Sequence, residues 1–140
     1  MRLILTLLLS TITLARAAPG NPAPMNGIWK LAGLHESAPG NPNLIMPTGE
    51  LFVVNGQVNG RSGCGRFAGT LTAAQNVVHI QIEALPPKPT ERCLYAVQGA
   101  FHDDLNAATQ YVLGSHSLIL FSDTARLTFE RIGFVTPANK

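Results

Sequence analysis

The residues in this chain best suited to chemistry are a serine and a cysteine that lie together in a glycine-rich segment. Ser62 and Cys64 both belong to the run GRSGCG at residues 60–65. Ser62 invites comparison with the hydrolase elbow G-x-S-x-G, which exposes a nucleophilic serine on a sharp turn between a strand and a helix. Here the fifth position is cysteine instead of glycine, and a strand pattern follows. The sequence therefore predicts that Ser62 is a turn residue and not a nucleophile.

The second candidate for chemistry is the thiol of Cys64. As a nucleophile it would need its thiolate form and a nearby base, for which His35, His79 and His102 are available. As a structural residue it would form a disulfide with Cys93, the only other cysteine in the chain. That bond would close a loop of about 30 residues, and it is favoured in an oxidising compartment. We therefore predict a Cys64–Cys93 disulfide, no catalytic residues and no enzyme activity.

The start of the chain indicates whether the protein is exported to an oxidising compartment. Arg2 precedes an apolar stretch over residues 3–14, and Ala-Arg-Ala at 15–17 has the small-x-small pattern of a signal-peptidase site. The apolar stretch is shorter than the roughly 20 residues that a membrane span needs. We expect residues 1–17 to be a cleaved signal peptide, with no lipid anchor and no membrane span left after cleavage. The mature chain is then expected to be periplasmic or secreted.

Charge and histidine spacing argue against two further kinds of site. The chain has 10 Lys and Arg against 8 Asp and Glu, but two of the arginines lie in the signal, so the mature chain is formally neutral. A neutral chain offers no electrostatic case for nucleic acid as a partner. The four histidines show no H-x-H or H-x-x-H spacing. We predict no metal site and no cofactor.

Alternating apolar and polar residues, with many turn formers between them, indicate a series of short strands. Residues 18–26 are rich in Pro, Gly and Asn and should form a flexible linker before a single domain at 27–132, with a tail at 133–140. Strands are expected at 27–34, 50–54, 57–59, 66–72, 77–83, 110–113, 117–121 and 126–132. The Asn55-Gly56 pair between two extended runs is the strongest hairpin signal.

One segment has helical instead of strand periodicity. Between Glu91 and Ala108 the apolar residues recur at spacings of three and four, as Leu94, Val97, Phe101, Leu105 and Ala108. The opposite face carries Gln98, His102, Asp103 and Asn106. Thr90 suits the N-cap position. The fold class predicted is therefore mainly β (α+β): a small antiparallel, barrel-like or strongly bent sheet of about seven strands, with one helix inserted before the last three.

In their order along the chain, several residues resemble the META domain family, the HslJ-like bacterial envelope proteins. The matching positions are Trp29-Lys30-Leu31, Leu51-Phe52, Gly63-Cys64, Phe67, Gly69, Thr90, Cys93, Phe101, Leu105, Tyr111, Leu118, Leu120, Leu127, Phe129 and Arg131. The resemblance covers residues 27–132, although the family usually has Asn where this chain has Gly65. It implies a small barrel-like domain with one helix, exported or envelope-associated, in a family linked in some members to heat-shock and antibiotic-tolerance phenotypes.

Three kinds of function are compatible with these features. The first is a non-enzymatic exported domain, monomeric, that acts in envelope maintenance or stress response. The second is a carrier of a small apolar ligand, since barrel-like sheets can enclose a cavity; Trp29, Phe52, Phe67 and Tyr111 are the candidate lining residues. The third is an inhibitor or a module that binds an envelope protein through the loop at 35–48.

Overall fold

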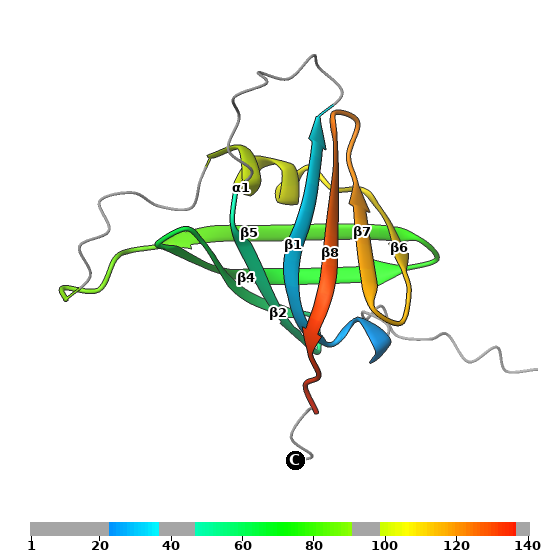
Figure 1. Cartoon of the computed structure of the whole chain (residues 1–140), viewed down its shortest axis with the longest axis horizontal. Coiled ribbons are helices and arrows are strands. Elements are labelled where there is room, and N and C mark those ends of the chain that lie inside the picture. The colour runs from blue at the N-terminus through cyan, green and yellow to red at the C-terminus, as the bar shows by residue number, and fades with distance from the viewer. Residues whose placement is uncertain (1–22, 37–46, 91–98, 137–140) are drawn as a thin grey trace, which may run out of the picture.

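The computed structural model describes residues 23–36, 47–90 and 99–136, and in them eight antiparallel strands form a closed barrel (Figure 1). Each strand pairs with the next along the chain, and the last pairs with the first. The elements are η1 (Ala23–Met25), β1 (Gly27–Glu36), β2 (Gly49–Val54), β3 (Gln57–Ser62), β4 (Gly65–Ala74), β5 (Val77–Leu85), α1 (Gly99–Asn106), β6 (Gln110–Leu113), β7 (Ser117–Phe121) and β8 (Ala125–Gly133). The predicted fold class is confirmed, with eight strands instead of about seven and one helix before the last three. In the described part of the chain, no helix has the length and apolar character to cross a membrane.

Three tight turns connect the strands from β2 to β5. Asn55 and Gly56 have φ values of 50° and 80°, as a type I′ turn requires, and this confirms the predicted hairpin. Gln75 and Asn76 form the same kind of turn, at 52° and 67°, without a glycine. Between β3 and β4, Gly63 takes a φ of 59° at the first turn position. These two-residue turns fix the register of four strands.

The barrel interior is filled by apolar side chains from every strand and from the helix. The alternation predicted for residues 77–83 is confirmed, because Val78, Ile80 and Ile82 are all buried. The helix contributes Phe101, whose ring centroid lies 6.0 Å from that of Phe67 and 6.4 Å from that of Phe129. Rings from three different elements therefore meet inside the barrel.

Between β5 and β6, strand pairing is short, and the helix supplies the further hydrogen bonds that hold the barrel closed. β5 and β6 share a single register pair, Val77 with Gln110. Farther along β5, the Ile82 N–H donates to Asn106 Oδ1 (2.8 Å), and Asn106 Nδ2 donates to the Ile82 carbonyl (3.2 Å). His102 Nε2 lies 3.1 Å from the same carbonyl oxygen. The side-chain amide thus takes the hydrogen-bonding positions of a neighbouring strand.

The predicted helix is confirmed in phase and corrected in extent. Phe101, Leu105 and Ala108 are buried as expected, but the helix ends at Asn106, and residues 91–98 lie outside the described residues. His102 and Asn106, which we expected to face away from the sheet, instead bond to β5. Periodicity could not reveal this contact, because a polar side chain can lie beside a strand when that strand offers unpaired backbone groups.

The opposite end of the barrel is closed by η1 and Arg131. The Trp29 Nε1–H donates to the Met25 carbonyl (2.9 Å), and both side chains are fully buried. The Arg131 guanidinium stacks on the Trp29 ring at 4.1 Å and donates to the carbonyls of Pro24 and Asn26. The prediction of a flexible linker over 18–26 is therefore wrong for residues 23–25, because these contacts hold them against the barrel.

Candidate functional site

The residues first considered for chemistry lie near the turn between β3 and β4. Ser62 is buried at the end of β3. Cys64 is exposed in the turn and is not a free cysteine. Its predicted partner, Cys93, lies outside the described residues, so the pairing of the two stays a prediction. Within residues 23–36, 47–90 and 99–136, no group of three or more His, Cys, Asp or Glu side chains is placed to hold a metal ion.

The four candidate cavity-lining residues do not come together. Trp29, Phe67 and Tyr111 belong to the packed core. Phe52 is 40% exposed and lies on the outer face of β2, because its neighbours Leu51 and Val53 are the ones that point inward. The sequence could not set this phase, since the run Leu51-Phe52-Val53 is apolar at every position. Phe52 is therefore a surface residue and not a lining residue of the interior.

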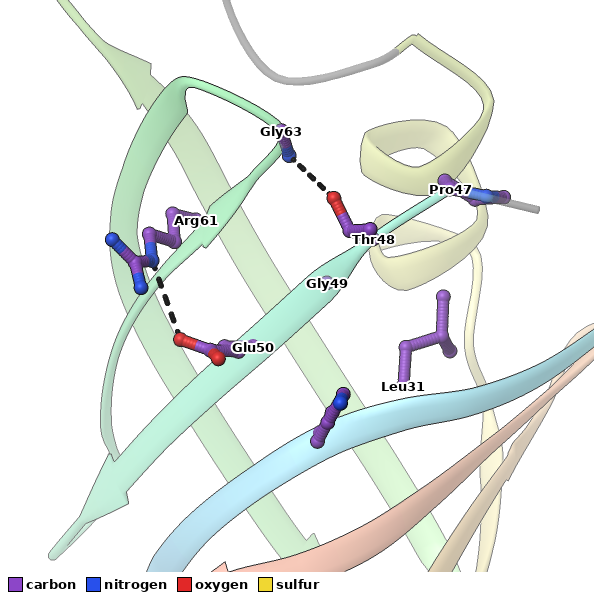
Figure 2. A pocket seen from close by; sticks show the side chains of 8 residues that line it. Leu31, Pro47, Thr48, Gly49, Glu50, Arg61 and Gly63 are labelled. Atoms are coloured by element: carbon purple, nitrogen blue, oxygen red, sulfur yellow. Dashed lines mark hydrogen bonds and ion pairs between the residues drawn. The ribbon is translucent and has the colours of Figure 1, made fainter. Parts of the chain in front are cut away.

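A cleft of about 380 Å³ lies where β1 and β2 separate (Figure 2). These strands pair from Gly27 to Lys30 on β1. Past Lys30, β1 continues to Glu36 paired with β8 and no longer with β2. The cleft is lined by Lys30, Leu31, Pro47, Thr48, Gly49, Glu50, Arg61 and Gly63. Its position on the sheet makes the outer face of β1–β3, and not the barrel interior, the candidate site.

Local sequence explains how the walls of this cleft are held. A Cβ atom at Gly49 would lie 2.6 Å from the Phe101 ring, so glycine lets the helix pack directly behind the cleft. Across it, the Gly63 N–H donates to both the carbonyl (3.2 Å) and the Oγ1 atom (3.1 Å) of Thr48. Figure 2 shows this bond spanning from the β3–β4 turn to the start of β2. The backbone of the site is therefore fixed from both sides.

Charged side chains form a continuous row across the outer face of the sheet. The strand register places Lys30 opposite Glu50, Glu50 opposite Arg61, and Arg61 opposite Arg66. Arg61 Nε donates to Glu50 Oε2 at 3.3 Å; the Arg61 side chain is 66% exposed and that of Glu50 is 40% exposed. Arg66 Nη2 donates to the carbonyl of Pro86 (3.3 Å). We call Lys30, Glu50, Arg61 and Arg66 the charge ladder.

A second pocket, of about 270 Å³, adjoins the cleft and shares Glu50 and Arg61 with it. It is lined by Ile28, Glu50, Leu51, Phe52, Asn59, Gly60, Arg61 and Arg66. The pocket therefore combines two arginines and one carboxylate with apolar side chains. Such a surface suits recognition of a partially apolar, partially anionic group. None of the charged residues in this pocket was predicted from the sequence to be a site residue.

A separate group of acidic residues lies between the helix and the end of β1. Burial raises the pKa of Asp104, and the nearby charges of Glu36 and Asp103 raise it further. The Asp104 Oδ2 atom is buried and has no hydrogen-bond partner among the described residues. Asp103 is exposed and lies 3.4 Å from His102 Nδ1. Ionised Asp104 therefore destabilises the folded state.

The fold and the site together define a closed, antiparallel eight-stranded barrel whose interior is packed and whose charged surface lies over β1–β4. No family model and no curated protein matches the chain. Two solved structures are similar to it. One is a DUF4847 family protein from Bacteroides vulgatus ATCC 8482, with a TM-score of 0.54 and 17% identity, over 75% of this chain and 92% of that one.

The other is a protein from Burkholderia xenovorans whose structure was determined by NMR. Its TM-score is 0.57 and its identity 17%, over 88% of this chain and 98% of that one. At this identity the likeness establishes the fold shared with both proteins.

Proposed function

We propose that this chain is a non-enzymatic, META/HslJ-like domain, exported to the bacterial envelope, that acts in envelope maintenance or stress response by binding a partner. The observation that carries the proposal is the position of two adjoining pockets on the outer sheet, sharing Glu50 and Arg61. Surfaces that bind proteins commonly combine exposed aromatic and arginine side chains. Phe52, Arg61 and Arg66 supply that combination here.

The same geometry favours a partner-binding module over a carrier of a small apolar ligand. A carrier of this kind uses the barrel interior. Here Trp29 and Phe67 are fully packed in the core cluster, and Phe101 enters from the helix to contact Phe67. Binding of a ligand inside would have to displace these rings, whereas the outer pockets are open.

Export and the Cys64–Cys93 disulfide belong to the same proposal. A domain that works outside the cytosol gains stability from a covalent link, for a loop of this length by about 3–4 kcal/mol. We expect the protein recovered from the periplasm or medium of a bacterial host to begin near Ala18. Its intact mass should not change on alkylation without reductant. A mass that retains residues 1–17, or two alkylated thiols in exported protein, would contradict this part of the proposal.

The function is tested by deletion of the gene in its host and complementation under heat and detergent stress. We expect the wild-type gene and the Arg126→Gln variant to restore survival, whereas Arg61→Gln does not. Arg126 is an exposed arginine on β8, outside both pockets, and is therefore a control matched in charge. Equal survival of the deletion strain and the wild type would contradict a role in stress response.

A screen with ester, peptide and glycoside substrates addresses the alternative of an enzyme. We expect background turnover for the purified domain, because Ser62 is buried and Cys64 is not a free cysteine. Turnover that Ser62→Ala or Cys64→Ser abolishes, in variants whose circular dichroism is unchanged, would overturn the non-enzymatic assignment.

A further inference from the structure

A third pocket, of about 560 Å³, lies over β3, β4 and β5 on the outer face of the barrel. Two cross-strand rows form it, and each has a small residue on β4 between larger polar residues on β3 and β5. These rows are Asn59–Ala68–Glu83 and Gln57–Thr70–Gln81. Adjacent strands are about 4.8 Å apart, so the two walls are separated by about 10 Å. The pocket is therefore a groove along β4, and we call it the polar groove.

The five polar side chains of this groove are available to a ligand. All five are exposed, and within residues 23–36, 47–90 and 99–136 none of them has a hydrogen-bond or ion-pair partner. Three are carboxamides, one is a hydroxyl, and one is the carboxylate of Glu83. A carboxamide both donates and accepts hydrogen bonds, so both walls offer donors as well as acceptors. In the charge ladder, by contrast, Arg61 is already bonded to Glu50.

These groups argue against three classes of ligand. An apolar ligand would displace water and leave the polar side chains without hydrogen bonds, which is costly. An anion finds no Lys, Arg or His among the residues that line the groove, and Glu83 repels it. An extended peptide cannot add to the sheet here, because β4 is paired with β3 on one side and β5 on the other. The groove therefore suits a neutral ligand rich in groups that both donate and accept hydrogen bonds.

The hydroxyls of a sugar ring meet this requirement. Each hydroxyl is a donor and an acceptor, so two neighbouring hydroxyls match the two functions of one carboxamide. In a β-linked chain of the cellulose or chitin type, the ring substituents are equatorial and project from the two edges of a flat ribbon, while its faces carry C–H groups. Such a ribbon in the polar groove directs its edges to β3 and β5 and one C–H face to Ala68. Shape and hydrogen bonding thus select the same ligand.

We propose that the polar groove binds a neutral, β-linked glycan, with the β3 wall bonded to hydroxyls along one edge of the sugar chain and the β5 wall bonded to those along the other. The inference goes beyond the proposed function, because the groove contains neither Arg61 nor Phe52. The two sites adjoin at Asn59, which lines both the groove and the pocket beside Phe52.

Titration of isotope-labelled protein with soluble tetrasaccharides, followed by NMR, tests this inference, because the side-chain amides of the groove have signals of their own. Cellotetraose and chitotetraose are the β-linked probes. We expect both to shift the signals of Gln57, Asn59 and Gln81, with dissociation constants in the millimolar range or below. Maltotetraose, which is α-linked and curved, and the anionic tetragalacturonate should bind at least about tenfold more weakly. The side-chain amide of Gln110, exposed on β6 outside the groove, should not shift.

Variants of the protein assign the binding to this groove. Ala68→Leu should abolish binding of cellotetraose, because the larger side chain fills the floor of the groove. Asn59→Ala should weaken binding roughly five- to tenfold through the loss of one carboxamide. The matched controls are Ala74→Leu at the end of β4 and Gln110→Ala on β6, both exposed and outside the groove, and they should leave the affinity unchanged. Thermal melts of every variant establish that each is folded.

Three results would overturn the inference. One is the absence of any shift with both β-linked probes at millimolar concentration. Another is wild-type affinity for cellotetraose in folded Ala68→Leu and Asn59→Ala. The third is binding of maltotetraose or tetragalacturonate as tight as that of cellotetraose, which would contradict the geometry and the charge of the groove. The proposed function is judged separately, by the stress phenotype of Arg61→Gln, and none of these results changes that test.

Discussion

At the end of the barrel where β1 begins, an arginine closes the structure, whereas at the opposite end a helix does. Arg131 stacks on Trp29 and donates to three backbone carbonyls, those of Pro24, Asn26 and Ser115. The helix instead buries the Phe101 ring inside the barrel. One end depends on a cation that satisfies loop carbonyls, and the other depends mainly on apolar burial.

The difference shows how a barrel of short strands avoids unpaired backbone groups at its ends. Where η1 and the loops meet, the carbonyls lie close together and a single guanidinium with several donors can serve them. Where β5 leaves β6, one strand offers both an N–H and a carbonyl, and the amide of Asn106 matches that pair. Each end thus uses the side chain whose donors and acceptors fit the groups exposed there.

The largest effect is expected at the helix end. Phe101→Ala would leave a cavity between Phe67 and Phe129 and should lower the free energy of unfolding by about 3–5 kcal/mol. Chemical denaturation measured by circular dichroism gives this value. Asp103→Ala, an exposed change on the same helix, should stay within about 0.5 kcal/mol. Similar losses for the two variants would show that Phe101 does not pack as described.

At the cation end the effect should be smaller. Arg131→Met keeps much of the apolar stem but removes the stacking on Trp29 and the bonds to carbonyls, for a loss of about 2–3 kcal/mol. The intrinsic fluorescence of Trp29, the only tryptophan, should change as its ring loses the cation. Arg126→Met on the same strand is the control. If the fluorescence of Trp29 changed but the free energy of unfolding did not, the contacts of Arg131 would not contribute to stability.

Asn106→Ala separates the polar contribution of the helix from the apolar one. It leaves the Ile82 N–H and carbonyl without their amide partner, which should cost about 1–2 kcal/mol. Hydrogen exchange of the Ile82 amide should become faster, while the amides between β3 and β4 keep their protection. Unchanged exchange at Ile82 would mean that the side-chain amide does not act as a strand substitute.

The smallest effect is expected at Asp104 on α1, where a substitution should stabilise the protein. Its raised pKa means that the folded state holds the proton more tightly than the unfolded state does, so ionisation disfavours folding. This contribution to stability is complete below the ordinary pKa of aspartate and is lost as pH rises through the raised value. Asp104→Asn should therefore raise the free energy of unfolding at about pH 7, by no more than about 1 kcal/mol because solvent screens a partly exposed charge. The gain should vanish at about pH 3, and a gain that persists there would assign the effect to packing.

Much of the fold could be predicted from local patterns. The Asn55-Gly56 turn and the alternation in β5 identify strands without tertiary information. β3 extends to Ser62, whereas the sequence predicted a strand only over 57–59. The prediction was too short because glycine, here Gly60, is typical of turns. In the structure a Cβ at Gly60 would lie 2.4 Å from Phe67 Cζ, so this glycine allows close packing within a strand.

The candidate site could be predicted only in part from the sequence. Counting outward from the Asn55-Gly56 turn places Glu50 opposite Arg61, and counting from the next turn places Arg61 opposite Arg66. Both pairs can therefore be predicted from the sequence once the two turns are assigned. The position of Lys30 opposite Glu50 depends on how the chain returns from β1 to β2, which no local pattern specifies. The bond between Asn106 and β5 likewise depends on tertiary placement.

The single register pair between β5 and β6 has a consequence for the order of folding. The hairpins from β2 to β5 and the meander from β6 to β8 form through contacts close in sequence, which are fast to make. β1 joins these two halves on one side by pairing with β2 and β8, and α1 joins them on the other side, at the seam between β5 and β6. Because this docking brings together residues from both halves, we expect the contacts of α1 with Ile82 to form late. Substitutions at Asn106 should then raise the unfolding rate and leave the folding rate nearly unchanged. We therefore expect the seam to govern the unfolding rate and the hairpins to govern the folding rate.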